Sequence, residues 1–142
     1  MVERGNARIY EVIDFYRGFH QYSFNTESEI YFHIYPSFTH GQYRIYRDGN
    51  QIIGFCNWCF LDDLAQAKFI KSGILYPDQW KSGKNFWIHD LVASKNTVRI
   101  AKDIKKMVLT MIGNRKDVSY LRIKNNQVFG RRKFRTKNHW GR

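Results

Sequence analysis

The sequence predicts a single α/β domain with a mixed, mostly antiparallel sheet and helices on both of its faces. Apolar residues recur at helical spacing near the N-terminus and again at residues 97–111. Between them, Asp48-Gly49 separates two runs of β-forming residues, which is a strong hairpin signal. The predicted order is α-α-β-β-α-β-α-β-β, which fits a mixed sheet with helices on both faces. A chain of 142 residues has room for one ordinary domain.

Two helices are predicted before the hairpin. Residues 7–22 place apolar side chains on one face, at spacings of three and four. The second helix begins at a capping box formed by Thr26 and Glu29. We expect it to span residues 27–34, because Pro36 disfavours helical geometry in the residue before it.

The hairpin strands are predicted at residues 42–47 and 50–60. A short helix follows at 61–71, with Asp62 or Asp63 near its N-terminus, where negative charge is favoured. Residues 72–84 read mostly as a loop.

The second half of the chain is predicted to alternate between strand and helix. A third strand at 85–92 is followed by a helix at 97–111, which Asn96 is placed to cap and Gly113 to end. Two more strands are expected at 118–123 and 127–134. We therefore expect the domain to span residues 1–130, with a basic tail at 131–142.

The composition is strongly basic, with 24 Lys and Arg against 12 Asp and Glu, for a net charge of +12. The positive electrostatic field of such a protein attracts an acidic partner, which could be nucleic acid, an anionic membrane, an acidic protein or the inside of a virion. No stretch approaches the roughly 20 apolar residues of a membrane span, and the N-terminus lacks a signal-peptide pattern. We therefore expect a cytoplasmic protein. Small size and basicity also fit a phage-encoded protein of the host cytoplasm or the virion.

The two cysteines form one C-x-x-C, at Cys56 and Cys59. A zinc site needs further soft ligands at similar spacing, and none is evident, so no metal is expected. Inside a strand, residues three apart face opposite sides. We expect two unpaired, partly buried cysteines.

Four stretches of the sequence together resemble the RTX-toxin-activating lysine acyltransferases, a family with the GNAT-like acyltransferase fold. They are QYRIYRDG at 42–49, FCNW at 55–58, WKSG at 80–83 and FWIHDLVA at 86–93. The resemblance covers roughly residues 20–95. It implies an enzyme that moves a fatty-acyl chain from acyl carrier protein to a lysine of a protein toxin.

The resemblance also implies a site. That family depends on a histidine near the N-terminus and an aspartate in a later strand, which fall here on His20 and Asp90. The matched stretches suggest Cys56, Trp58 and Trp87 as substrate-binding residues. That family also has an asparagine on its second helix that is important for function. This asparagine has no counterpart here, and the region instead holds Tyr31, His33 and Tyr35.

Such a pair suits the chemistry of acyl transfer. A histidine can remove the proton of the attacking lysine, and an aspartate can fix its tautomer and stabilise the imidazolium. Asp90 stands in an otherwise apolar run, where a carboxylate is costly to bury unless it is paired. We expect His89 to point to the opposite face, towards solvent, and His33 and His40 to be ordinary surface residues.

No bound cofactor is expected. Enzymes of the wider fold that use acetyl coenzyme A cradle its pyrophosphate with a glycine-containing loop before a helix N-terminus. The corresponding residues, 92–99, contain no glycine. Acyl carrier protein, which is acidic, is therefore the expected donor rather than free coenzyme A.

Two other functions stay open at this point. The chain could be a catalytically silent relative that serves as a phage structural or host-directed binding protein. It could also bind nucleic acid through basic residues interleaved with aromatics near the C-terminus. The basic residues concerned are Arg131, Arg132, Lys133, Arg135 and Lys137, with stacking offered by Phe129, Phe134 and Trp140. The oligomeric state is also open, with a homodimer as one arrangement.

Overall fold

The computed structural model describes residues 2–124 and 127–137 and contains one five-stranded sheet. The strands lie in chain order: β1 (Tyr43–Asp48), β2 (Gln51–Leu61), β3 (Asn85–Ala93), β4 (Asp117–Lys124) and β5 (Gln127–Arg135). Neighbouring strands are antiparallel except β3 and β4, which are parallel. The predicted mixed, mostly antiparallel α/β fold is confirmed.

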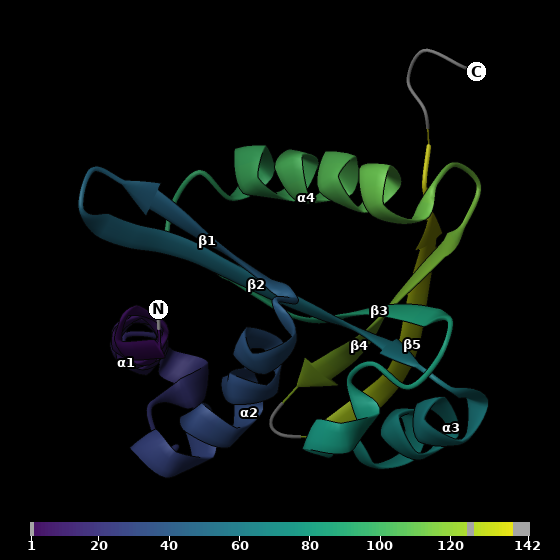
Figure 1. Ribbon diagram of the computed structural model, residues 1–142, viewed down its shortest axis with the longest axis horizontal. Coiled ribbons are helices and arrows are strands. Elements are labelled where there is room, and N and C mark those ends of the chain that lie inside the picture. Colours follow the sequence, from purple (N-terminus) through teal and green to yellow (C-terminus); the bar gives the residue numbers. More distant parts are fainter. Residues whose placement is uncertain (1, 125–126, 138–142) are drawn as a thin grey trace.

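Helices cover both faces of this sheet (Figure 1). On one face lie α1 (Val2–Arg17), α2 (Glu27–His40) and α3 (Asp63–Ser72), and on the other lies α4 (Thr97–Ile112). The side chains of β2 alternate between the two faces. Phe55 packs beneath α1 and α2, whereas Cys56 packs beneath α4. Cys59 packs beneath α3, so the two free cysteines face opposite sides, as predicted, but both are fully buried rather than partly buried.

Among the described strands, the parallel neighbours β3 and β4 have the fewest aligned residues. Because α4 makes the crossover between these strands, they are not joined by a tight turn. In the described residues, Trp87 and Ser119 are the one aligned pair between them. Beyond that pair the strands diverge, and the space between them is covered by α4 (Figure 1).

The first helix is shorter at its C-terminal end than predicted. α1 ends at Arg17, and a 3-10 turn, η1 (His20–Tyr22), takes the place of the predicted last turn. Gly18 N donates to Phe15 O, and Phe19 N donates to Tyr16 O, so the hydrogen bonds tighten here. The change of direction brings the Tyr22 side chain back over the sheet.

The second helix confirms the capping box and contradicts the predicted end. Thr26 Oγ1 accepts from Glu29 N, and Thr26 N donates to Glu29 Oε1. The helix continues past Pro36 to His40 and ends at Gly41, whose φ is +65°. Pro36 removes one hydrogen-bond donor but is buried, so packing outweighs its local preference.

The remaining elements lie close to their predicted positions. Asp62 caps α3, because its Oδ1 accepts from Ala65 N. A second 3-10 turn, η2 (Pro77–Gln79), lies in the predicted loop. Asn96 occupies the residue before α4, but its side chain makes no capping hydrogen bond. No described helix is both long and apolar enough to cross a membrane.

The predicted boundary between the domain and a basic tail, after residue 130, falls inside β5. β5 pairs with β4 as far as Arg135, opposite Asp117, so residues 131–135 belong to the sheet. Residues 138–142, with Trp140, lie outside the described residues, as does the side chain of Phe129.

Candidate functional site

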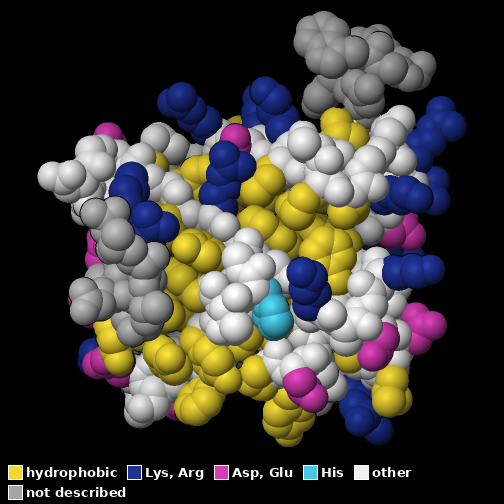
Figure 2. Space-filling view, in the orientation of Figure 1, with side chains coloured by type: hydrophobic (Ala, Val, Ile, Leu, Met, Phe, Trp, Pro, Cys, Tyr) yellow, Lys and Arg dark blue, Asp and Glu magenta, His cyan; other side chains and the backbone are white. Residues whose placement is uncertain are grey.

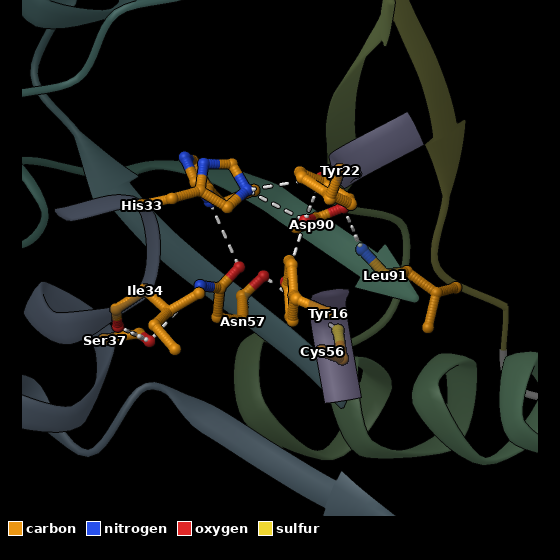
Figure 3. Close-up of polar contacts among 10 residues, drawn as sticks. Tyr16, Tyr22, His33, Ile34, Ser37, Cys56, Asn57, Asp90 and Leu91 are labelled. Carbon is orange, nitrogen blue, oxygen red and sulfur yellow. Dashed lines mark hydrogen bonds and ion pairs between the residues drawn. The ribbon is translucent and has the colours of Figure 1, made fainter. Parts of the chain in front are cut away.

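Asp90 on β3 collects hydrogen bonds from three separate elements (Figure 3). Its Oδ2 accepts from the Tyr16 hydroxyl at 2.8 Å, from the Tyr22 hydroxyl at 2.7 Å and from His33 Nε2 at 2.8 Å. Leu91 N donates to the other oxygen, Oδ1, at 2.9 Å. The Asp90 side chain is only 14% exposed. One nearly buried carboxylate thus ties α1, η1 and α2 to the sheet.

The contacts keep Asp90 ionised at neutral pH. Burial alone would raise the pKa of Asp90, but the hydrogen bonds from His33 and Tyr22 and the nearby His33 charge lower it to about 2. Burial and the adjacent carboxylate raise the pKa values of Tyr16 and Tyr22, so both hydroxyls remain donors. Because an ionised carboxylate only accepts, His33 Nε2 carries the proton in this pair. In the neutral imidazole, Nδ1 is therefore left as the basic nitrogen.

A β-bulge places His89 beside this network, and the prediction that it faces solvent is wrong. Asn57 pairs with Asp90 while Trp58 pairs with Ile88, so His89 is the extra residue on β3. The bulge breaks the strict alternation of side chains. The His89 ring lies 4.6 Å from that of His33, and its Nδ1 is 3.2 Å from Asn57 Oδ1. Burial lowers the pKa of His89 to about 3, so it is neutral at pH 7.

A cavity of about 270 Å³ opens where β3 and β4 diverge, and Asp90 and His89 are in its wall. Three sheet strands and α4 contribute the rest of the lining, which is mainly apolar. The apolar side chains include Ile88, Leu91, Ile104, Tyr120, Leu121 and Phe134. Apolar pockets with a few convergent polar groups are typical of ligand sites, although this one is slightly below their usual size. The site therefore combines an imidazole–carboxylate pair with an adjoining apolar cavity.

The structure brings His33 rather than His20 to Asp90. His20 lies in η1 with an exposed side chain, and none of the contacts described for Asp90 involves it. The prediction that His33 is an ordinary surface residue is wrong. A signal for His33 was present in the sequence, because it follows Ile30 by three residues and precedes Ile34 on the buried face of α2. His40 is exposed, as expected.

The three residues predicted to bind substrate lie in the hydrophobic core. Cys56 and Trp58 pack under α4, and burial raises the pKa of the Cys56 thiol. Trp87 packs under α3, and its Nε1 donates to Gln66 Oε1 at 2.8 Å. None of the three is among the described residues that line the cavity. Their contacts are those of core side chains.

The basic residues predicted to bind nucleic acid divide into two groups. Arg131 Nε donates to Ser119 Oγ, and its guanidinium lies 5.2 Å from the Trp87 ring centre. Arg135 pairs with Asp117. The others, Arg132, Lys133 and Lys137, are exposed. Within the described residues, no group of three His, Cys, Asp or Glu side chains is arranged to hold a metal ion.

Comparison with known proteins decides the family. The sequence model of the RTX toxin acyltransferase (HlyC) family matches residues 16–134. The chain belongs to the RTX toxin acyltransferase family. The resemblance noted in the sequence is thereby confirmed. The matched region runs from Tyr16 to Phe134, so it contains both the Asp90 network and the cavity.

Individual members of the RTX toxin acyltransferase family match a shorter part of the chain. The leukotoxin-activating lysine-acyltransferase LktC of Pasteurella haemolytica-like sp. (strain 5943B) is 34% identical over 61 residues, which is 42% of this chain and 37% of that protein. LktC serotype A1 of Mannheimia haemolytica is also 34% identical over 61 residues, 36% of its length. The match thus spans little more than a third of these relatives.

Proposed function

We propose that the protein transfers a fatty-acyl group from acyl carrier protein to the side chain of a lysine in another protein. Family membership supports acyl transfer in general. One observation carries the specific proposal: His33 Nε2 lies 2.8 Å from Asp90 Oδ2, and Asp90 is in the wall of an apolar cavity. The cavity offers a place for the acyl chain, and the pair offers the proton transfer that an amine nucleophile needs.

The proposed reaction begins with deprotonation. His33 Nδ1 takes a proton from the lysine ammonium, while Nε2–H keeps its hydrogen bond to Asp90. The imidazolium that forms is stabilised by the carboxylate, as in the His–Asp part of a catalytic triad. The His33 side chain is 31% exposed, so a protein lysine can approach it from solvent.

The second step is transfer itself. The lysine amine forms a bond to the thioester carbonyl carbon, and the C–S bond of the tetrahedral intermediate then breaks. The nitrogen of the intermediate loses its second proton to solvent, and the imidazolium returns its proton to the departing thiolate, so the products are an amide, a thiol and one released proton. Tyr16 and Tyr22 hold the Asp90 carboxylate in place throughout, because both hydroxyls donate to Oδ2.

Acyl transfer from a defined donor tests the proposal. Acyl carrier protein loaded with a labelled fatty-acyl group is incubated with the protein and a lysine-containing acceptor peptide, and intact masses of both are followed. We expect His33→Gln and Asp90→Asn each to slow transfer by about 100-fold or more, the usual contribution of general acid–base catalysis. His20→Ala is the matched control and should change the rate by less than about threefold, because its side chain is exposed and makes none of the contacts described for Asp90.

Two results would contradict this assignment. A large loss in His20→Ala with an unaffected His33→Gln would return the role of base to the histidine that the family resemblance implies. No acyl loss with the unaltered protein, in the presence of the peptide, would favour a catalytically silent binding protein.

A further inference from the structure

The solvent face of α4 carries an unneutralised row of positive charge. The helix buries Ile100, Ile104 and Val108 against the sheet. Its opposite face exposes Arg99, Lys102 and Lys106 at spacings of three and four, and a fourth exposed cation, Lys105, lies at the edge of that face beside the cavity. None of the four forms an ion pair with any residue in the described part of the chain.

This charge arrangement works against the helix itself. Lys102 and Lys106 are four residues apart, and like charges at that spacing are destabilising. The acidic residue of α4, Asp103, points elsewhere: it accepts from the Tyr46 hydroxyl at 2.6 Å and pairs with Arg44. The row of cations therefore has no evident structural use.

The row runs along the helix that forms one wall of the cavity. Ala101, Ile104 and Lys105 all line the cavity, and Lys105 Nζ lies 5.8 Å from the ring centre of Phe134 on another wall. Near the start of α4, Val98 is 68% exposed beside Arg99 and Lys102, at a shallow depression. In Figure 2, Lys and Arg side chains gather along the upper edge, where Figure 1 places α4, above a broad apolar area.

Building on the proposed function, we propose that the solvent face of α4 is the docking surface for the acyl donor, an acidic protein that presents its thioester on a flexible arm. Arg99, Lys102 and Lys106 contact acidic side chains of the donor, and Val98 adds an apolar contact. Lys105 stands at the cavity rim where the arm enters.

Charge and residue composition both favour this partner. A net charge of +12 steers an acidic protein towards the surface, and complementary charges set its orientation. Sequence-tolerant nucleic-acid binding usually adds aromatic side chains on which bases stack. α4 carries no aromatic residue. A protein with clustered carboxylates therefore fits this face better than a nucleic acid does.

The test compares two double variants with the same change in charge. In Arg99→Gln/Lys102→Glu, the new glutamate can pair with Lys106 four residues later, which supports the helix. The control, Lys68→Gln/Lys71→Glu, makes the same change on exposed positions of α3, which lies on the other face of the sheet. Binding of purified acyl carrier protein is titrated at low and at physiological salt.

We expect the α4 variant to bind acyl carrier protein at least about tenfold more weakly at low salt, with a flatter dependence on salt, and the control to stay within about twofold. Equal weakening in both variants would overturn the proposal, because only net charge would then matter. Unchanged binding in the α4 variant would overturn it too. The proposal would also be overturned if a DNA oligonucleotide, rather than the carrier protein, bound in an α4-dependent way.

A second readout separates docking from chemistry. An acyl-pantetheine thioester carries the same acyl group without the protein. The α4 variant should keep its transfer rate with this small donor and lose rate only with the carrier protein. Equal loss with both donors would show that the cations act on the reaction or the fold instead. If no donor is consumed by any form, the proposed function fails, and the binding titration still decides the docking surface.

Discussion

Asp90 acts at once as a structural anchor and as part of the proposed site. Its Oδ2 atom accepts from Tyr16 on α1, Tyr22 on η1 and His33 on α2, and the three rings also pack against one another. A buried carboxylate with so many donors is held in one orientation. Residues that fix the fold here are therefore the same ones that orient the imidazole.

The partly buried imidazole of His89 predicts a specific loss of stability in acid. Burial lowers the pKa of His89 from 6.5 to about 3, so the unfolded chain binds a proton over a pH range in which the folded chain does not. The stability is complete above about pH 6.5 and falls towards pH 3, by up to about 1.4 kcal/mol per pH unit. The pKa of Asp90 is lowered to about 2, so its contribution is lost only below about pH 4.

Urea unfolding between pH 4 and pH 7 measures this effect. In His89→Gln the fall in unfolding free energy with decreasing pH should be clearly shallower than in the unaltered protein. The matched control is His40→Gln, at the exposed end of α2, which should keep the full slope. A slope unchanged in His89→Gln would show that other groups govern the acid sensitivity.

At the scale of elements, the features that depend on residues close together in the sequence were predicted correctly. The capping box at Thr26 and the Asp-Gly hairpin each involve residues close in sequence, and both are present. The end of α2 was missed because Pro36 was given more weight than Gly41, the residue that ends the helix. The bulge at His89 could not be predicted, because it depends on how β2 and β3 pair.

The same difference between local and long-range contacts explains which parts of the site were predicted. Asp90 stood out as a carboxylate in an apolar strand, and the structure surrounds it with donors. The partner histidine was sought at His20 because the family resemblance pointed there. The contact between α2 and β3 that brings in His33 joins residues 57 positions apart, and no local pattern specifies it.

The approach of the loop before β3 to the start of α3 predicts a strict need for glycine at position 83. A Cβ added to Gly83 would lie 2.4 Å from Asp62 Cα, and backbone cannot move aside as a side-chain tip can. Gly83 N also donates to Phe60 O, which holds the loop against β2. We expect Gly83→Ala to lower the unfolding free energy by about 1–3 kcal/mol.

Chemical denaturation would show the loss of stability in Gly83→Ala as a lower denaturant concentration at the unfolding midpoint. Gly18→Ala serves as the comparison, because the nearest atom to its added Cβ lies at 3.4 Å, so little rearrangement is required. A Gly83→Ala protein as stable as the Gly18→Ala protein would mean that the loop relaxes easily.

At the scale of the whole molecule, the two proposed roles fall on opposite faces of the sheet. The Asp90 network lies beneath α1 and α2, whereas the cationic helix α4 covers the opposite face (Figure 1). The two meet where β3 and β4 diverge, and the cavity there is lined by residues of both. A mixed sheet with one parallel crossover is what produces this opening. In the proposed reaction, donor and acceptor can therefore approach from different sides.

This arrangement predicts that filling the cavity will discriminate between acyl donors by chain length. Ala101 on α4 lines the cavity, and Ala101→Phe places a ring in it. Each buried CH₂ contributes about 0.8 kcal/mol, so excluding two of them should slow transfer of a long acyl chain by about tenfold or more. Transfer of a two-carbon group, which needs little of the cavity, should change much less.

Ala67→Phe, at an exposed position on α3, is the matched control and should preserve the unaltered chain-length profile. Rates with carrier proteins bearing short and long acyl groups, measured beside thermal unfolding of each variant, distinguish the outcomes. Equal slowing of both donors in Ala101→Phe, with a normal unfolding temperature, would place the acyl chain elsewhere.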